Sequence, residues 1–149
     1  MPEQMFEVTI DKFTFLIPKD LSYSDEGIWA RREGGRARLG LADFAQQRSG
    51  DIAFVRIKPV GTDLKPGDEF ADLETVKVDV CFPSPVKGTI VEVNPSLESA
   101  AELINQDPYG KGWLAVVELA DWERDRGRLL DAETYAALVK GQAEAELKA

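Results

Sequence analysis

The chain has 149 residues, with 18 basic and 27 acidic side chains and a formal net charge of −9. This length suits one core, so we expect residues 1–149 to form a single domain, and the acidic balance disfavours nucleic acid or an anionic membrane as a partner. Histidine is absent, which excludes Ser-His-Asp triads, Cys-His pairs and histidine metal ligands.

The N-terminal part carries the signals of two β-hairpins. Apolar and polar residues alternate from Phe6 to Ile17 on both sides of Asp11-Lys12, which predicts a hairpin with one apolar face. Farther along, Gly34-Gly35 separates residues 28–31 from residues 37–41, and a glycine pair between two such runs predicts a second hairpin. Both segments therefore favour antiparallel β-structure.

The middle of the chain continues in β-structure after one helical turn. Residues 41–47 contain good helix formers and end at Ser49-Gly50, which predicts a short helix. Residues 52–57 and 89–93 are rich in β-branched and aromatic side chains, which predicts strands. The spacing of the turn signals predicts a mainly β fold, either a small sandwich or a flattened barrel.

One lysine stands out by its position. Lys77 separates two β-rich runs, residues 70–76 and 78–82, so we expect it in the turn of a tight hairpin. A lysine in such a turn is displayed to solvent, and its primary amine is then open to modification. Taken alone, a lysine in a β-turn is most often an ordinary solvated charge.

The C-terminal part changes to a helical period. Apolar residues recur at helical intervals over residues 97–104, behind Ser96 as a candidate cap, which predicts a short helix. Residues 113–119 predict a last strand, and Asp131 is a candidate cap for a terminal helix. The apolar stripe expected on that helix consists of Ala132, Tyr135 and Val139.

Cellular location is indicated by the single cysteine and by the start of the chain. Cys81 has no partner for an internal disulfide, which fits a reducing compartment. The start, Met1-Pro2-Glu3-Gln4, is acidic where a secretory signal is basic, and no apolar run reaches membrane-spanning length. We therefore expect a cytoplasmic protein.

Several ordered stretches resemble one known family, the H protein of the glycine cleavage system. Each stretch is weak alone, but their joint order and spacing are specific, and they cover most of the chain. The stretches are Tyr23-Ser24 before Trp29, Leu39-Gly40-Leu41, Phe44-Ala45-Gln46, Gly50–Val55, Pro59–Thr62, Glu74–Lys77, Ser84–Gly88, Val91–Asn94, Asn105–Gly110 and Gly112–Leu114.

The resemblance implies a fold of two small antiparallel sheets with short peripheral helices and a C-terminal helix, the barrel-sandwich hybrid of lipoyl domains. It implies lipoate in amide linkage to Lys77. The recognition motif would be Glu74, Thr75, Val76 and Val78 around that lysine. Members of this family are monomeric carriers without catalytic residues, so the resemblance implies a protein that is not an enzyme.

The partners implied by the resemblance are of two kinds. A lipoate ligase or lipoyl transferase attaches the cofactor. Glycine dehydrogenase then loads an aminomethyl group, aminomethyltransferase removes it, and dihydrolipoamide dehydrogenase reoxidises the dithiol. The carrier thus moves a sulfur-bound intermediate between these enzymes, on a flexible arm that raises the local concentration of the reacting group.

Departures from the family pattern keep alternatives open. Gly27-Ile28 precedes Trp29 where the family usually has His-Glu, Thr75 replaces a serine, and bulkier residues follow Lys77. A related branch, the lipoate-binding proteins of heterodisulfide-reductase-like sulfur oxidation, is therefore a second interpretation. An unmodified interaction module is a weaker one, and a carboxylate-dependent hydrolase is weaker still.

Two further expectations concern the surroundings of Lys77. We expect Cys81 to be a buried or half-buried strand residue, with thiol exchange near the lipoyl sulfurs as the alternative. Carboxylates cluster near the lysine, and we expect this acidic collar to steer docking onto basic clefts of partner enzymes. The collar consists of Asp68, Glu69, Asp72, Glu74 and Asp79.

Overall fold

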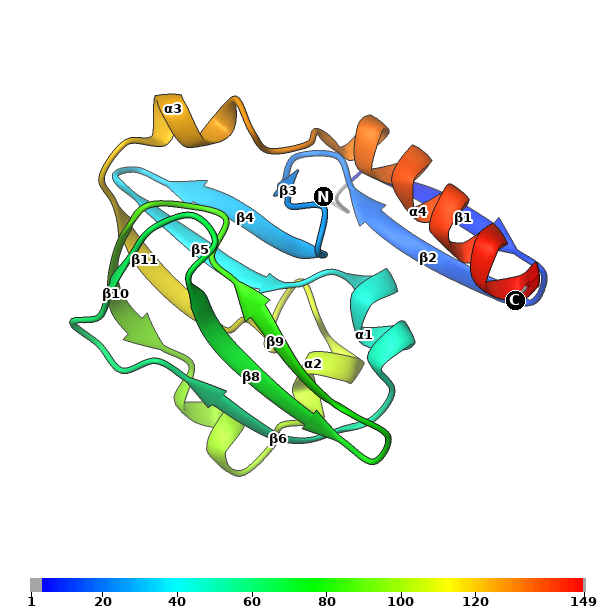
Figure 1. The fold of residues 1–149 in the computed structure, drawn as a ribbon, viewed down its shortest axis with the longest axis horizontal. Coiled ribbons are helices and arrows are strands. Elements are labelled where there is room, and N and C mark those ends of the chain that lie inside the picture. Colours follow the sequence, from blue (N-terminus) through cyan, green and yellow to red (C-terminus); the bar gives the residue numbers. More distant parts are fainter. Residues whose placement is uncertain (1–3, 149) are drawn as a thin grey trace.

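A computed structural model describes residues 4–148 (Figure 1); most of the acidic start Met1–Gln4 lies outside this range. No helix in the described range is both long and apolar enough to cross a bilayer. The strands are β1 (Met5–Ile10), β2 (Phe13–Pro18), β3 (Ser22–Tyr23), β4 (Ile28–Glu33), β5 (Arg36–Leu41), β6 (Ile52–Ile57), β7 (Asp63–Leu64), β8 (Glu69–Thr75), β9 (Asp79–Pro83), β10 (Gly88–Val93) and β11 (Ala115–Leu119). The helices are α1 (Asp43–Ser49), the 3₁₀ helix η1 (Pro95–Glu98), α2 (Leu103–Gln106), α3 (Trp122–Arg126) and α4 (Ala132–Lys148).

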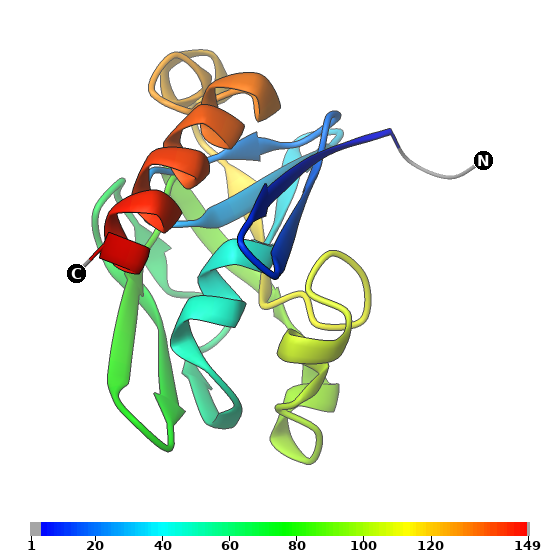
Figure 2. The ribbon, with the colours of Figure 1, turned by 90° about the vertical axis from the view of Figure 1, so that its right-hand side faces the viewer.

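The strands form antiparallel sheets, as the sequence pattern predicts. Six strands pair in the order β3-β4-β5-β11-β10-β7, and three pair in the order β6-β8-β9. The N-terminal hairpin β1-β2 forms a separate two-stranded sheet beside α4 (Figures 1 and 2). The mainly β fold with small antiparallel sheets and a C-terminal helix is thus confirmed, and the hairpin is an addition to the two sheets that were expected.

The main core lies between the six-stranded and the three-stranded sheet. Inward-facing side chains from both sheets form one cluster, because alternate residues of a strand point to opposite faces. Its largest fully buried members include Phe70 and Leu73 from β8, Leu39 from β5 and Ile90 from β10. This core supports β8, whose last residue, Thr75, begins the turn that contains Lys77.

A second core lies under the terminal helix. The stripe expected on α4 is buried, and Tyr135 stacks on Tyr23 with ring centroids 4.4 Å apart. Asp131 caps the helix, because its side chain accepts a hydrogen bond from the Thr134 N–H at 2.8 Å. Helix α4 runs alongside the hairpin (Figure 2), so the N-terminal hairpin and the C-terminal helix pack against each other.

The loop after α2 ties the second core to the sheets. Trp29 is fully buried, and its indole N–H donates to the Pro108 carbonyl oxygen at 2.9 Å. The Tyr109 hydroxyl donates to the Leu16 carbonyl oxygen at 2.6 Å and accepts from the Asp43 N–H at 2.9 Å. This loop therefore holds the hairpin against α1. Burial raises the pKa of Tyr109, which keeps its phenol protonated.

The helix expected over residues 97–104 is wrong in its extent and its cap. The segment forms the 3₁₀ helix η1 and then the separate helix α2. Asn94, not Ser96, is the cap, since its side-chain oxygen accepts from the Ser96 N–H at 3.1 Å. The Asn94 amide also donates to the carbonyl oxygens of Lys111 and Trp113, both at 2.8 Å. These long-range bonds decide where the helix begins.

Candidate functional site

The candidate site is the turn between β8 and β9, which projects at the lower edge of Figure 1, away from α4. The Thr75 N–H donates to the Val78 carbonyl oxygen at 2.9 Å and closes the turn. Val76 and Lys77 occupy its middle, and Val76 is 90% exposed. The expected tight hairpin is present, although Val76 and Val78 belong to the turn and not to the strands.

The hydroxyl of Thr75 fixes the shape of this turn. It donates to the Val78 carbonyl oxygen at 3.0 Å and accepts from the N–H groups of Lys77 at 3.2 Å and Val78 at 3.0 Å. One donor and two acceptor sites are all a hydroxyl has, so its capacity is fully used. Thr75 itself is 8% exposed. The turn is therefore held from inside by the residue at which this chain departs from the usual serine of the family pattern.

Replacing Thr75 by valine should destabilise the protein by about 1 kcal/mol, because two backbone N–H groups and one carbonyl oxygen lose a partner. Thr75→Ser retains the hydroxyl and should stay within about 0.5 kcal/mol of the wild type. Urea unfolding monitored by tryptophan fluorescence measures both values. Equal stability of the two variants would show that the hydroxyl does not hold the turn.

Lys77 is exposed, and within residues 4–148 it takes part in no ion pair. Its amine is neither packed inside the protein nor held by an internal carboxylate. Four carboxylates of the acidic collar lie on β8 and β9: Glu69, Asp72, Glu74 and Asp79. Within the described part of the chain, Asp72 alone among these four forms an ion pair, with Arg56 at 3.4 Å. The turn thus displays one amine beside unpaired negative charge.

A hollow of about 440 Å³ begins beside the turn, where Val78 forms part of its wall. Asp25, Glu26 and Arg48 lie in its lining together with Cys81. Hydrogen bonding with Asp25, and then partial burial, raise the pKa of Glu26, so this carboxyl keeps its proton to higher pH than an isolated glutamate. The hollow therefore has both polar and apolar walls close to the turn.

The structure corrects the expectation that Cys81 is a buried or half-buried strand residue. It is exposed on β9, whereas its neighbour Phe82 is buried. The alternation of faces along a strand contained this signal, since an inward Phe82 turns Cys81 outward. Desolvation of the sulfur, followed by the carboxylates of Glu69 and Asp72, raises the pKa of the Cys81 thiol. A thiol that stays protonated is a poor nucleophile, which argues against exchange with lipoyl sulfurs.

Cys81→Ser should change the free energy of unfolding by less than about 0.5 kcal/mol, because an exposed side chain leaves no cavity behind. Thermal unfolding of the two proteins in reducing buffer provides the measurement. A loss above about 1.5 kcal/mol would mean that the sulfur packs against its neighbours after all.

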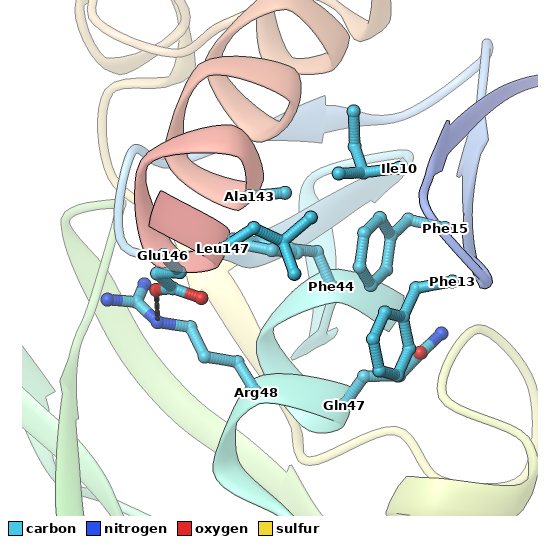
Figure 3. A pocket seen from close by; sticks show the side chains of 9 residues that line it. All are labelled: Ile10, Phe13, Phe15, Phe44, Gln47, Arg48, Ala143, Glu146 and Leu147. Carbon is cyan, nitrogen blue, oxygen red and sulfur yellow. Dashed lines mark ion pairs between the residues drawn. The ribbon is translucent and has the colours of Figure 1, made fainter. Parts of the chain in front are cut away.

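A second hollow, of about 200 Å³, lies between the N-terminal hairpin, α1 and the end of α4 (Figure 3). Phe13, Phe44 and Leu147 contribute apolar walls, and Arg48 pairs with Glu146 at 2.7 Å on its rim. Figure 3 shows the aromatic rings and the leucine facing one another. No residue of the Lys77 turn lines this hollow, so it does not belong to the candidate site.

Sequence reasoning missed one residue beside the turn. Phe54 on β6 is 64% exposed and pairs with Glu74 of β8. The apolar run of residues 52–57 reads as a buried strand, and strict alternation would place Phe54 on the same face as the buried Ile52. No local signal in the sequence separates these two side chains.

Comparisons with known proteins show that the chain is similar to glycine cleavage H proteins. Residues 21–142 match the family model described as glycine cleavage H-protein. The chain is 42% identical over 124 residues to the glycine cleavage system H protein of Oceanobacillus iheyensis, covering 83% of this chain and 98% of that one. Identity to the glycine cleavage system H protein of Bacillus subtilis is 41% over 124 residues, with 83% and 97% coverage.

The fold is also similar to that of a solved H-protein structure. The crystal structure of a glycine cleavage system H protein from Mycobacterium marinum superposes with a TM-score of 0.71 at 31% identity, covering 81% of this chain and 97% of that chain. The family match begins after β2, so the N-terminal hairpin lies outside it. On the match over residues 21–142 and on these relatives, the chain belongs to the glycine cleavage H-protein family.

Proposed function

We propose that this protein is a lipoyl carrier of the glycine cleavage system and that Lys77 is the attachment residue. The observation that supports this most directly is the exposed amine in a hydrogen-bonded turn of a chain that belongs to the H-protein family; this amine forms no ion pair among the described residues. The residues fit the cofactor: amide formation needs a free amine, and Glu74, Thr75, Val76 and Val78 surround it as the recognition motif.

The chain itself would supply support and position. The Thr75 hydroxyl and the β8–β9 pairing hold the turn in one shape, so the attachment point stays fixed while the arm moves. The bound lipoate would supply the dithiol chemistry that accepts an aminomethyl group. We propose that the protein is not itself an enzyme and that residues 1–149 act as one carrier unit.

The partners we propose follow from this role. A lipoate ligase or lipoyl transferase would acylate Lys77, and glycine dehydrogenase, aminomethyltransferase and dihydrolipoamide dehydrogenase would use the arm. Three carboxylates of the acidic collar, Glu69, Glu74 and Asp79, form no ion pair among the described residues, which supports docking to basic clefts on these enzymes. The relatives compared above are named for glycine cleavage, so the alternative role in sulfur oxidation gains no support from them.

Intact-mass analysis of the protein from its native host tests the proposal. We expect the mass increment of one lipoyl group, mapped by peptide fragmentation to the peptide that contains Lys77. A protein that carries no increment while the cell's other lipoyl proteins are modified would contradict the proposal and favour an unmodified interaction module.

A further inference from the structure

Selection of Lys77 from among the lysines needs more than exposure. The chain has nine lysines, and among those described with side chains seven are exposed besides Lys77: Lys12, Lys19, Lys58, Lys65, Lys87, Lys111 and Lys140. An enzyme that acylates only Lys77 must therefore recognise the surface around it. Before acylation the reacting atom is Nζ of a lysine side chain, so the active site must come within one side-chain length of the turn.

The surface next to the turn carries an exposed aromatic ring. Phe54 is 64% exposed, although a phenylalanine that is left in water forgoes about 1.5–3 kcal/mol of burial energy. Phe54 lies opposite Glu74 on β8. Glu74 directly precedes Thr75, at which the turn begins. Val76 and Val78, which flank Lys77, are 90% and 49% exposed. Apolar surface is thus concentrated around the amine.

A β-bulge places Phe54 on the outer face. The register of β6 on β8 shifts between Ile52, which pairs with Thr75, and Phe54, which pairs with Glu74. Residues two apart in a regular strand share a face, so without the bulge Phe54 would point inward with Ile52, which is 5% exposed. The extra residue reverses this parity, and bulges near functional sites commonly redirect a side chain in this way. The exposure of Phe54 is therefore built into the sheet.

Two carboxylates lie in the same cross-strand row as the Phe54 ring, those of Glu74 and Asp79. Glu74 lies directly opposite Asp79 on β9, and like charges across a strand pair are destabilising. In the next outward-facing pair of β6 and β8, Arg56 neutralises the charge of Asp72 by an ion pair. Neither Glu74 nor Asp79 has an ion-pair partner among the described residues. A cation from another molecule would relieve this repulsion. The charge pattern thus fits a partner with basic residues.

We propose that Phe54, Glu74 and Asp79 form the docking surface for the enzyme that acylates Lys77. The inference rests on the proposed function and extends it. The partner would have an apolar pocket for the Phe54 ring, bordered by lysine or arginine, beside the channel that holds an activated lipoyl group. In the reaction the Lys77 amine attacks the acyl carbon of lipoyl adenylate, the amide bond forms, AMP leaves and the amine gives up its proton to solvent.

The acylating enzyme fits this surface better than the enzymes that use the finished arm. Their substrate is the dithiol at the end of a long flexible chain, so their active sites need not approach Phe54. The acylating enzyme must instead reach the amine of an unmodified lysine, so its active site has to come close to the turn. Partner recognition concentrated on a central aromatic side chain is also the usual pattern in protein interfaces.

The experiment measures kcat/KM of a lipoate–protein ligase, supplied with lipoate and ATP, on the full-length unmodified protein. Phe54→Ala should lower kcat/KM about tenfold, as truncation of a central interface aromatic commonly does. Val60→Ala is the matched control, because Val60 is 62% exposed just beyond the opposite end of β6, and it should leave the rate unchanged. The double change Glu74→Gln with Asp79→Asn should also lower kcat/KM, by a factor that shrinks as salt is added.

Two further readouts separate the possible outcomes. Acylation of Lys77 by a small succinimidyl ester, together with thermal unfolding, should be the same in the wild type and in Phe54→Ala. If the ligase rate is unchanged in Phe54→Ala, the docking surface is wrong, whether or not a later enzyme slows, while lipoylation of Lys77 in the wild type still supports the carrier role. If the wild type itself takes up no lipoyl group at Lys77, the proposed function fails and the inference with it.

Discussion

Replacing Lys77 by arginine should abolish lipoyl incorporation and reduce glycine cleavage in a reconstituted system to the rate without carrier. Arginine keeps the positive charge and the exposed position, but its guanidinium stays protonated at any pH that the protein survives and does not form the amide. The turn does not depend on the lysine side chain, since the Thr75 hydroxyl bonds only backbone groups of Lys77 and Val78. The measurement combines intact mass with glycine-dependent NADH formation.

Lys111→Arg is the control for this prediction, because Lys111 is also exposed and lies in the loop after α2. It should incorporate lipoate and support turnover like the wild type. Normal incorporation into Lys77→Arg would place the attachment at another lysine and would remove the central element of the proposed function. Both variants should unfold at the wild-type temperature, which separates lost chemistry from lost structure.

Replacing Gly40 by alanine should cost about 2–3 kcal/mol of stability, through overpacking of the second core. Gly40 pairs with Trp29 across β4 and β5, and a Cβ at this position would overlap the indole ring. The ring has little room to move, because it is fully buried and its N–H is bonded to the Pro108 carbonyl oxygen. Denaturant unfolding should show a lower midpoint with an unchanged slope.

Gly141→Ala provides the matched control, since Gly141 lies inside α4 and nothing lies within 4 Å of an added Cβ. The same chemical change should there stabilise the protein by about 0.5–1 kcal/mol through helix propensity. A Gly40→Ala variant as stable as the wild type would mean that Trp29 and the loop at Pro108 move together at little cost. The opposite signs expected at the two glycines distinguish the overlap at Gly40 from a general effect of adding a methyl group.

Local patterns predicted much of the fold because they report short-range preferences. The glycine pair at Gly34-Gly35 does connect β4 to β5, and Asp131 does cap α4. Lys77 does lie between two strands in a tight turn. Each of these features depends on backbone geometry and on neighbours within a few residues. The buried stripe of α4 likewise follows from helical periodicity.

Two features depend on contacts between distant segments, which the sequence pattern did not predict. The cap of the helix expected over residues 97–104 was misplaced, because Asn94, which caps it, is held by bonds to Lys111 and Trp113, which are distant in the chain. The N-terminal hairpin was predicted, but its position beside α4 comes from packing between the hairpin and that helix. Such contacts join segments that no local window contains together.

The sequence by itself determined where the strands turn, which lysine lies in the exposed turn, and which family the ordered motifs resemble. Only the tertiary structure decided what else surrounds that lysine: an outward Phe54, and a Glu74 that lies opposite Asp79 without an ion-pair partner among the described residues. The physical reason is register. One extra residue in β6 reverses the face of every side chain that follows, and register is set by pairing with β8 and by the core beneath it.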